Sequence, residues 1–129
     1  PRLATGYFIN QTSSVASQGV IPLSLSSITG NTQNISSGVN GALLQPGTYS
    51  VEYSTTGSSA SGVTVGVNLN GITQPQLTQT TTTAATTSTN VAGNGVITIT
   101  SPNTLLTLNN LGADTATFTN TNLVIKQLV

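Results

Sequence analysis

Apolar and polar residues alternate along several short segments of this chain. In the segment 48–54, Tyr49, Val51 and Tyr53 occupy one side and polar side chains occupy the other. In the segment 63–69, valines and a leucine take every second position. Alternation is the pattern of a β-strand with one buried face, so both segments predict strands.

Turn residues separate such segments at intervals of about eight to twelve residues, as in a β-sandwich or barrel. Asn70-Gly71 is a pair typical of a tight hairpin, and residues 101–103 separate two further alternating runs. No run of about twelve residues shows the period of a helix. The pattern predicts one all-β domain over residues 1–129, built as a two-sheet antiparallel sandwich.

A threonine-rich run, TQTTTTAATTSTN, occupies residues 78–90. Threonine is β-branched and suits a strand whose outer side is wet. We expect residues 78–83 to form an exposed strand of an outer sheet, and residues 84–90 to form a turn and the start of the next strand. The alternative is a glycosylated, mucin-like stalk. Such stalks usually contain proline, whereas this run contains none and lies inside the chain.

The end of the chain becomes apolar on both sides. Leu123 and Ile125 share one side, whereas Val124, Lys126 and Leu128 share the other. Near-continuous apolar runs belong to strands that are covered on both sides. We expect the Leu123 side to face the core, because a lysine fits poorly there, and the other side to need a partner outside the monomer.

Charged side chains are almost absent: Arg2, Glu52, Asp114 and Lys126 are the whole set, and the net charge is zero. Two basic residues cannot displace counterions from phosphates, which excludes a nucleic-acid binder. No stretch approaches the roughly 20 apolar residues of a membrane span. The start of the chain has no signal-peptide hydrophobic region, and we expect an excised domain or a processed product.

The chain contains no cysteine, which excludes disulfides and thiolate chemistry and leaves the redox compartment open. Its neutral surface of Ser, Thr, Asn and Gln is typical of a protein kept outside cells. Asn10 and Asn34 begin N-glycosylation patterns, but chance matches are expected in a chain so rich in Asn, Ser and Thr.

Catalytic and metal sites are tested by exclusion. General acid–base catalysis needs His or a pair of carboxylates, and Glu52 and Asp114 are predicted to lie in a strand and in a turn. A serine nucleophile has no base to activate it, and zinc has neither Cys nor His to bind. Asp114 with backbone carbonyls would make at most one weak calcium site. We predict no enzyme activity, no cofactor and no metal site.

Three segments in a fixed order resemble one family: LLQPGTYSVEYS at 43–54, VTVGVNLNG at 63–71 and TATFTNTNLVIKQLV at 115–129. They are similar to segments of the tumour-necrosis-factor-like and complement-globular-head jelly roll. More narrowly, they resemble the C-terminal heads of bacterial collagen-like glycoproteins on the exosporium of spores. The resemblance spans residues 6–129, although this chain has fewer aromatic residues than the animal members and shows no Gly-X-Y repeat.

The resemblance implies a two-sheet antiparallel jelly roll of about ten strands. It also implies a compact homotrimer with both chain ends on the side of a collagen-like stalk, and residues 1–5 would be the end of that stalk or of a linker. The implied function is a non-catalytic head that trimerises, caps the stalk and belongs to the outer coat of a spore or cell. The alternative is the head of an adhesin or phage fibre that binds a host receptor or a glycan, for which Tyr7 is the free aromatic candidate.

The resemblance and the two-sided final strand together predict the subunit interface. In the resembled fold the strand of Glu52 lies beside the final strand in the inner sheet. Glu52, Val124, Lys126 and Leu128 would then share the face that meets the other subunits. Opposite charges on adjacent strands attract each other, so we expect Glu52 and Lys126 to form an ion pair, within or between subunits, near the trimer axis.

The lack of histidine and cysteine makes a prediction for stability. No other side chain normally titrates between about pH 5.5 and 9, so the melting temperature should stay nearly constant over that range. Scanning calorimetry in matched buffers would measure it. A change of more than about ten degrees within the range would contradict the prediction and reveal a bound ion or a strongly shifted group.

Overall fold

The computed structural model describes residues 3–80 and 88–129. The regular structure in these residues consists of strands. In chain order they are β1 (Thr5–Val15), β2 (Ser24–Thr29), β3 (Ile35–Gly38), β4 (Gly41–Leu44), β5 (Gly47–Ser58), β6 (Thr64–Leu69), β7 (Ile72–Thr80), β8 (Thr89–Ile99), β9 (Thr104–Asn110) and β10 (Ala116–Gln127). The all-β prediction is confirmed. None of the described residues forms a helix that is long and apolar enough to cross a membrane.

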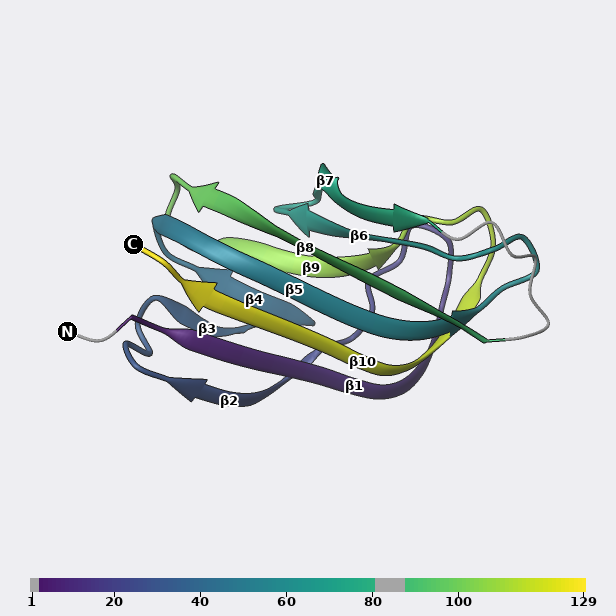
Figure 1. Ribbon diagram of the computed structural model, residues 1–129, viewed down its shortest axis with the longest axis horizontal. Helices are drawn as coiled ribbons and strands as arrows, with labels where there is room; N and C mark the ends of the chain where they lie inside the picture. Colours follow the sequence, from purple (N-terminus) through teal and green to yellow (C-terminus); the bar gives the residue numbers. More distant parts are fainter. Residues whose placement is uncertain (1–2, 81–87) are drawn as a thin grey trace.

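The strands form two antiparallel five-stranded sheets that pack face to face (Figure 1). We call the sheet with the order β2-β1-β10-β5-β8 the inner sheet, and the sheet with the order β3-β4-β9-β6-β7 the outer sheet. Neighbouring strands are often far apart in the sequence: β10, the last strand, lies between β1 and β5. This arrangement confirms the predicted two-sheet sandwich.

The core between the sheets is built from alternate residues of the long central strands. Tyr49, Val51 and Tyr53 of β5 are buried, and so are Leu123 and Ile125 of β10. Because side chains alternate across a strand, the residues between them point away from the core. The predicted core sides of both strands are therefore confirmed.

A bulge interrupts β10 at Asn120 and Thr121, which together oppose the single residue Thr55 of β5. Asn120 has a φ of 52°, and Thr121 Oγ1 lies 2.7 Å from Thr55 Oγ1 inside the protein. The extra residue shifts the alternation by one position. Phe118 and Leu123 therefore both reach the core, although plain alternation would place them on opposite sides.

The hairpin predicted at Asn70-Gly71 joins β6 to β7. Both residues have positive φ, 50° and 83°, which is the conformation that a tight two-residue hairpin requires. β7 is an edge strand of the outer sheet and carries Thr78 and Thr80, as predicted for the start of the threonine run. The continuation of that run, residues 81–87, lies outside the described residues.

The sandwich already includes two of the five residues expected to end a stalk. Ala4 is fully buried, and its N–H donates to Gln127 Oε1 at 3.1 Å. The Gln127 N–H in turn donates to the Ala4 carbonyl at 2.8 Å, and Thr5 begins β1. Residues 1–2 lie outside the described residues.

Tyr53 joins the two sheets across the core. Its hydroxyl lies 2.6 Å from the Leu77 carbonyl and 3.1 Å from the Val65 carbonyl, both in the outer sheet, and shares its single proton between these two acceptors. Gly93 of β8 leaves room for the ring, because a Cβ at that position would lie 2.7 Å from the Tyr53 Cζ atom. Burial in this apolar setting raises the pKa of Tyr53 to about 12.

The buried Tyr53 hydroxyl predicts a loss of stability at alkaline pH. The unfolded chain ionises its tyrosines near pH 10, whereas the folded chain keeps the Tyr53 proton until about pH 12. The folded state binds more protons in this window, so the free energy of unfolding falls as the pH rises through it. Urea denaturation at steps from about pH 9 to about pH 12 would measure the fall. A urea midpoint that stays constant over this pH range would contradict the raised pKa of Tyr53.

Removal of the hydroxyl gives a matched test. Tyr53→Phe leaves the Leu77 and Val65 carbonyls without this donor, which should lower the free energy of unfolding by about 1–3 kcal/mol and flatten the alkaline fall. Tyr7→Phe is the control, because the half-buried Tyr7 hydroxyl bonds to Asn122 near the surface and its loss should cost less than about 1 kcal/mol. Equal losses in the two variants would be inconsistent with the role given to Tyr53.

Candidate functional site

The face of the inner sheet that points away from the core is the main candidate for function, and we call it the open face. Strand pairing brings its members onto one side of β1, β10, β5 and β8. They are Thr5, Tyr7, Ile9, Ser50, Glu52, Ser54, Ala92, Asn94, Val96, Asn122, Val124 and Lys126. Each of them is half-buried or exposed in the single chain.

Apolar side chains of the open face come from β1, β10 and β8, whereas β5 contributes polar residues to it. Tyr7 of β1 pairs with Val124 of β10, and Ile9 follows on the same side of β1. At the edge, Val96 of β8 is 58% exposed, and Leu128, just after β10, is 45% exposed. Apolar side chains gathered on one surface are typical of a region that a partner covers.

The structure places three of the four predicted interface residues on the open face. Glu52 lies directly opposite Val124, and Lys126 lies directly opposite Ser50. Leu128 follows the end of β10, where its N–H still donates to the backbone of β5 at 2.7 Å. The assignment of these residues to a subunit interface remains a proposal.

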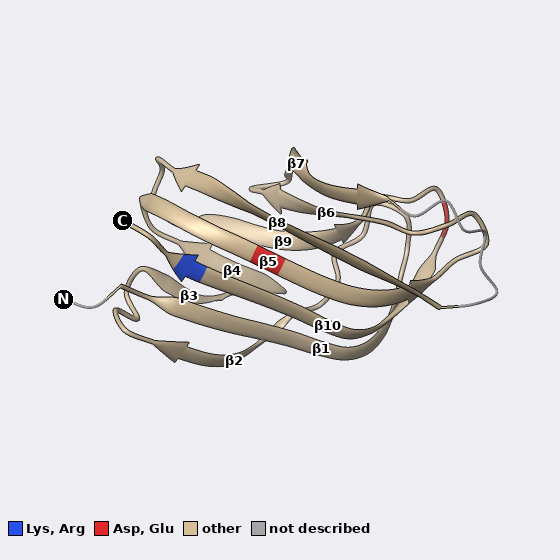
Figure 2. Cartoon of the chain, viewed as in Figure 1, with Lys and Arg blue, Asp and Glu red and all other residues tan. Residues whose placement is uncertain are grey.

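The predicted ion pair between Glu52 and Lys126 is not formed within one chain. Both side chains are exposed, and no salt bridge joins them in the part of the chain that the structure describes. They occupy neighbouring rows of the open face, on β5 and β10 (Figure 2). The register of β10 against β5 explains why the pair does not form. The residue directly opposite Lys126 is Ser50, and Glu52 lies one row further along β5, at the longer diagonal distance. A pair between subunits remains a prediction.

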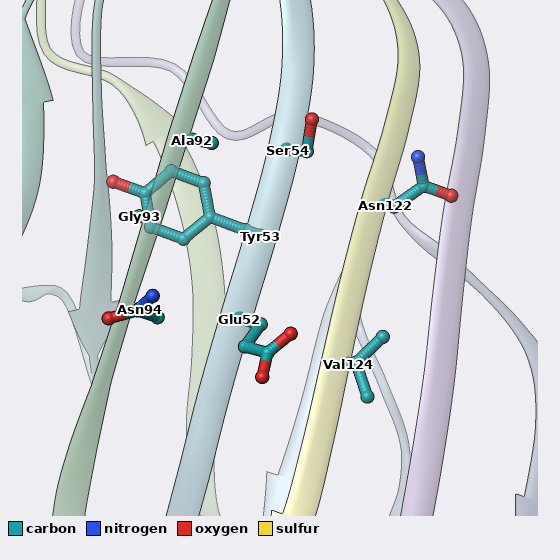
Figure 3. Close-up of a pocket in the computed structure, with 8 residues that line it drawn as sticks. All are labelled: Glu52, Tyr53, Ser54, Ala92, Gly93, Asn94, Asn122 and Val124. Carbon is teal, nitrogen blue, oxygen red and sulfur yellow. The ribbon is translucent and has the colours of Figure 1, made fainter.

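A hollow of about 330 Å³ lies on the open face beside Glu52, and we call it the Glu52 hollow (Figure 3). It is lined by Glu52, Tyr53, Ser54, Ala92, Gly93, Asn94, Asn122 and Val124. The Glu52 carboxylate lies between the backbones of β5 and β10 and points toward Val124 (Figure 3). Within the described residues, neither this carboxylate nor the Asn94 amide has a hydrogen-bond partner.

A second hollow of about 340 Å³ lies at the bulge of β10. It is lined by Tyr7, Ile9, Asn10, Gln11, Asn120, Thr121 and Asn122. Asn122 lines both hollows: its Oδ1 accepts from the Tyr7 hydroxyl at 2.6 Å, and its Nδ2 donates to the Asn120 carbonyl at 3.1 Å. Tyr7, the aromatic candidate for glycan binding, lies outside the core and lines this hollow, with a half-buried ring and a bonded hydroxyl. Its role in glycan binding remains a prediction.

The two carboxylates do not converge on one cleft. Glu52 lies on β5, whereas Asp114 lies in the loop after β9 (Figure 2). In residues 3–80 and 88–129, no group of three His, Cys, Asp or Glu side chains could hold a metal ion. Of the two glycosylation patterns, Asn34 uses its amide nitrogen to donate to Gln127 Oε1 at 3.1 Å, and a glycan there would break this contact.

Sequence reasoning missed most of the Glu52 hollow. Alternation already places Ser54 on the side of Glu52, so this residue was within reach of the pattern. Asn94 and Asn122 were not, because they come from other strands. Strand pairing places Asn94 opposite Glu52 and Asn122 opposite Ser54. The local sequence pattern does not predict which strands pair with each other.

No protein-family model and no curated protein matches this chain. Solved structures do match it. The Eiger TNF of S. frugiperda has a TM-score of 0.78 at 9% identity, with 100% of this chain and 94% of that chain covered. The globular domain of zebrafish complement 1qA has a TM-score of 0.72 at 11% identity, with 100% and 98% covered. The fold is the TNF-like jelly roll.

A vertex protein shares the same jelly roll. The PRD1 vertex protein P5 matches with a TM-score of 0.62 at 12% identity, and 100% of this chain and 99% of that chain are covered. Identities this low show the shared fold and leave function to be argued from the site. The resemblance seen in the sequence is thus confirmed for the jelly roll, and its narrower part, the exosporium heads, remains a proposal.

Proposed function

We propose that this chain is the non-catalytic, trimeric globular head of a collagen-like surface glycoprotein, outside the cell in the outer coat of a spore or cell. The head trimerises through the open face and caps the stalk. The observation that carries the proposal is the character of that face. Apolar side chains from β1, β10 and β8 lie on it beside the polar residues of β5, and it holds only two charges, Glu52 and Lys126, among the described residues.

A sheet face that remains exposed to solvent is normally polar, and apolar residues then lie only on the face that packs on the core. The open face departs from this pattern at Tyr7, Ile9, Val96 and Val124. A second copy packed on it would remove these side chains from water. Identical subunits commonly close into symmetric rings, in which the same contact is repeated around an axis.

The ends of β1 and β10 favour a stalk at one end of the sandwich. β1 begins beside the end of β10, where Gln127 N–H donates to the Ala4 carbonyl at 2.8 Å (Figure 1). A preceding stalk would therefore join the head at that end and leave the opposite loops free. The sequence upstream of Pro1 tests this part of the proposal: Gly-X-Y triplets support it, and any other sequence contradicts it.

The domain should be a homotrimer in solution, since a trimer covers the open face of every copy. Light scattering coupled to size exclusion at micromolar concentration would give the mass directly. The expected mass is that of three 13.0 kDa chains. A monodisperse monomer would contradict the proposed function.

The two sides of β10 should respond differently to a charge. Ile125→Asp places a carboxylate in the core and should prevent folding, because Ile125 is fully buried. Val124→Asp places it on the open face and should yield folded monomer. Circular dichroism reports folding, and light scattering reports mass.

Ile72→Asp is the control for this pair. Ile72 lies on β7 of the outer sheet and is 68% exposed, so a charge there should change neither folding nor mass. Identical behaviour of the Val124 and Ile125 variants would show that the faces have been assigned incorrectly.

A second candidate function, a head that binds a host receptor or glycan, is favoured by the hollow at the bulge. Amides gather there, and the buried Asn10 Oδ1 has no partner among the described residues. Hydroxyls of a sugar would supply donors. A glycan array discriminates the two functions: specific binding that is lost in Asn122→Ala favours this candidate, and a blank array favours the structural head.

A further inference from the structure

The Glu52 carboxylate would lose its hydration if a second copy covered the open face. In the single chain the side chain is exposed and water solvates it. A second copy packed on the open face removes that water. Burial of a carboxylate without a partner is strongly unfavourable, so the assembly needs a cation at this position.

Lys126 is the cation that the chain offers. It is the one basic side chain in the described residues, since Arg2, the other basic residue of the sequence, lies outside them. Lys126 is exposed on the same face, one row from Glu52. It does not line the Glu52 hollow, and no salt bridge joins the two side chains in their own chain. Both charges therefore meet an incoming copy unpaired.

The hollow has the chemistry to receive a lysine side chain. Val124 and Ala92 offer apolar contact to the four-carbon stem, which lysine commonly packs along apolar surface. The ammonium group has three N–H donors and no acceptor. Glu52, the side-chain oxygen of Asn94 and the hydroxyl of Ser54 supply acceptors around the hollow (Figure 3).

We propose that the Glu52 hollow is a socket for Lys126 of a second copy of this chain. The inference rests on the proposed trimer and names its charged contact. A rotation axis that passes close to these rows brings Lys126 of one copy to Glu52 of the next. A closed ring repeats this contact at every interface, so that each charge on the open face is paired.

Neutralisation of one or both charges tests the socket. Dissociation constants would be measured by analytical ultracentrifugation on dilution. Lys126→Met alone should raise the constant by at least about 100-fold, because it leaves a buried unpaired carboxylate. The double variant Lys126→Met with Glu52→Gln should recover most of that loss. Asp114→Asn is the matched control, since it removes the other acidic side chain, away from the open face, and should change nothing.

Charge reversal separates a pair between copies from a pair within one chain. Lys126→Glu and Glu52→Lys each place like charges on the open face, so each alone should assemble poorly. Mixed together, they should form more trimer than either alone, because two of the three interfaces in a mixed ring then join lysine to carboxylate. A pair confined to one chain would gain nothing from mixing, and that result would overturn the socket.

The remaining outcomes separate the socket from the function on which it rests. A monomeric wild-type domain would overturn both. A trimeric wild type whose constant is unchanged by Lys126→Met would overturn the socket alone, and so would a double variant as weak as the single one. A glycan that binds the wild type but not Glu52→Gln, with assembly unchanged, would assign the hollow to a sugar and also overturn the socket.

Discussion

The burial of one side of β5 and β10 decides what the opposite side presents. Tyr49, Val51 and Tyr53 fill the core from β5, and side chains repeat every two residues, so a shift of register by one residue would expose them all. The same constraint holds Glu52 on the open face and, through strand pairing, sets Val124 directly opposite it. The candidate interface is therefore a consequence of the core and cannot be changed independently of it.

The small number of charged side chains makes association of this face with a second copy easier. Only Glu52, Asp114 and Lys126 have charged side chains among the described residues, so these side chains offer little repulsion against a second copy. One edge strand of the inner sheet, β8 (Thr89–Ile99), pairs with β5 without a bulge and contains neither a charged residue nor proline. Natural proteins usually protect such edges or cover them with another chain. The edge and the open face thus both favour association.

Alternation in the sequence was enough to predict the strands, the hairpin at Asn70-Gly71 and the core sides of β5 and β10. It could not predict the bulge, because Asn120 and Thr121 look like any other polar strand residues. Nor could it separate structural asparagines from surface ones. Asn110 is buried, its Nδ2 donating to the Val15 carbonyl at 2.9 Å and its Oδ1 accepting from Gly112 N–H at 3.0 Å. Such roles depend on contacts between distant segments.

The central claim is that another copy covers the open face, and thiol labelling tests it most directly because the chain has no cysteine of its own. Val96→Cys on the open face and Ile72→Cys on the outer sheet replace side chains that are 58% and 68% exposed in the single chain. Under assembling conditions a maleimide should label the Val96 variant at least about tenfold more slowly than the Ile72 variant, since a covered thiol is inaccessible. Equal rates in the native protein would contradict the account.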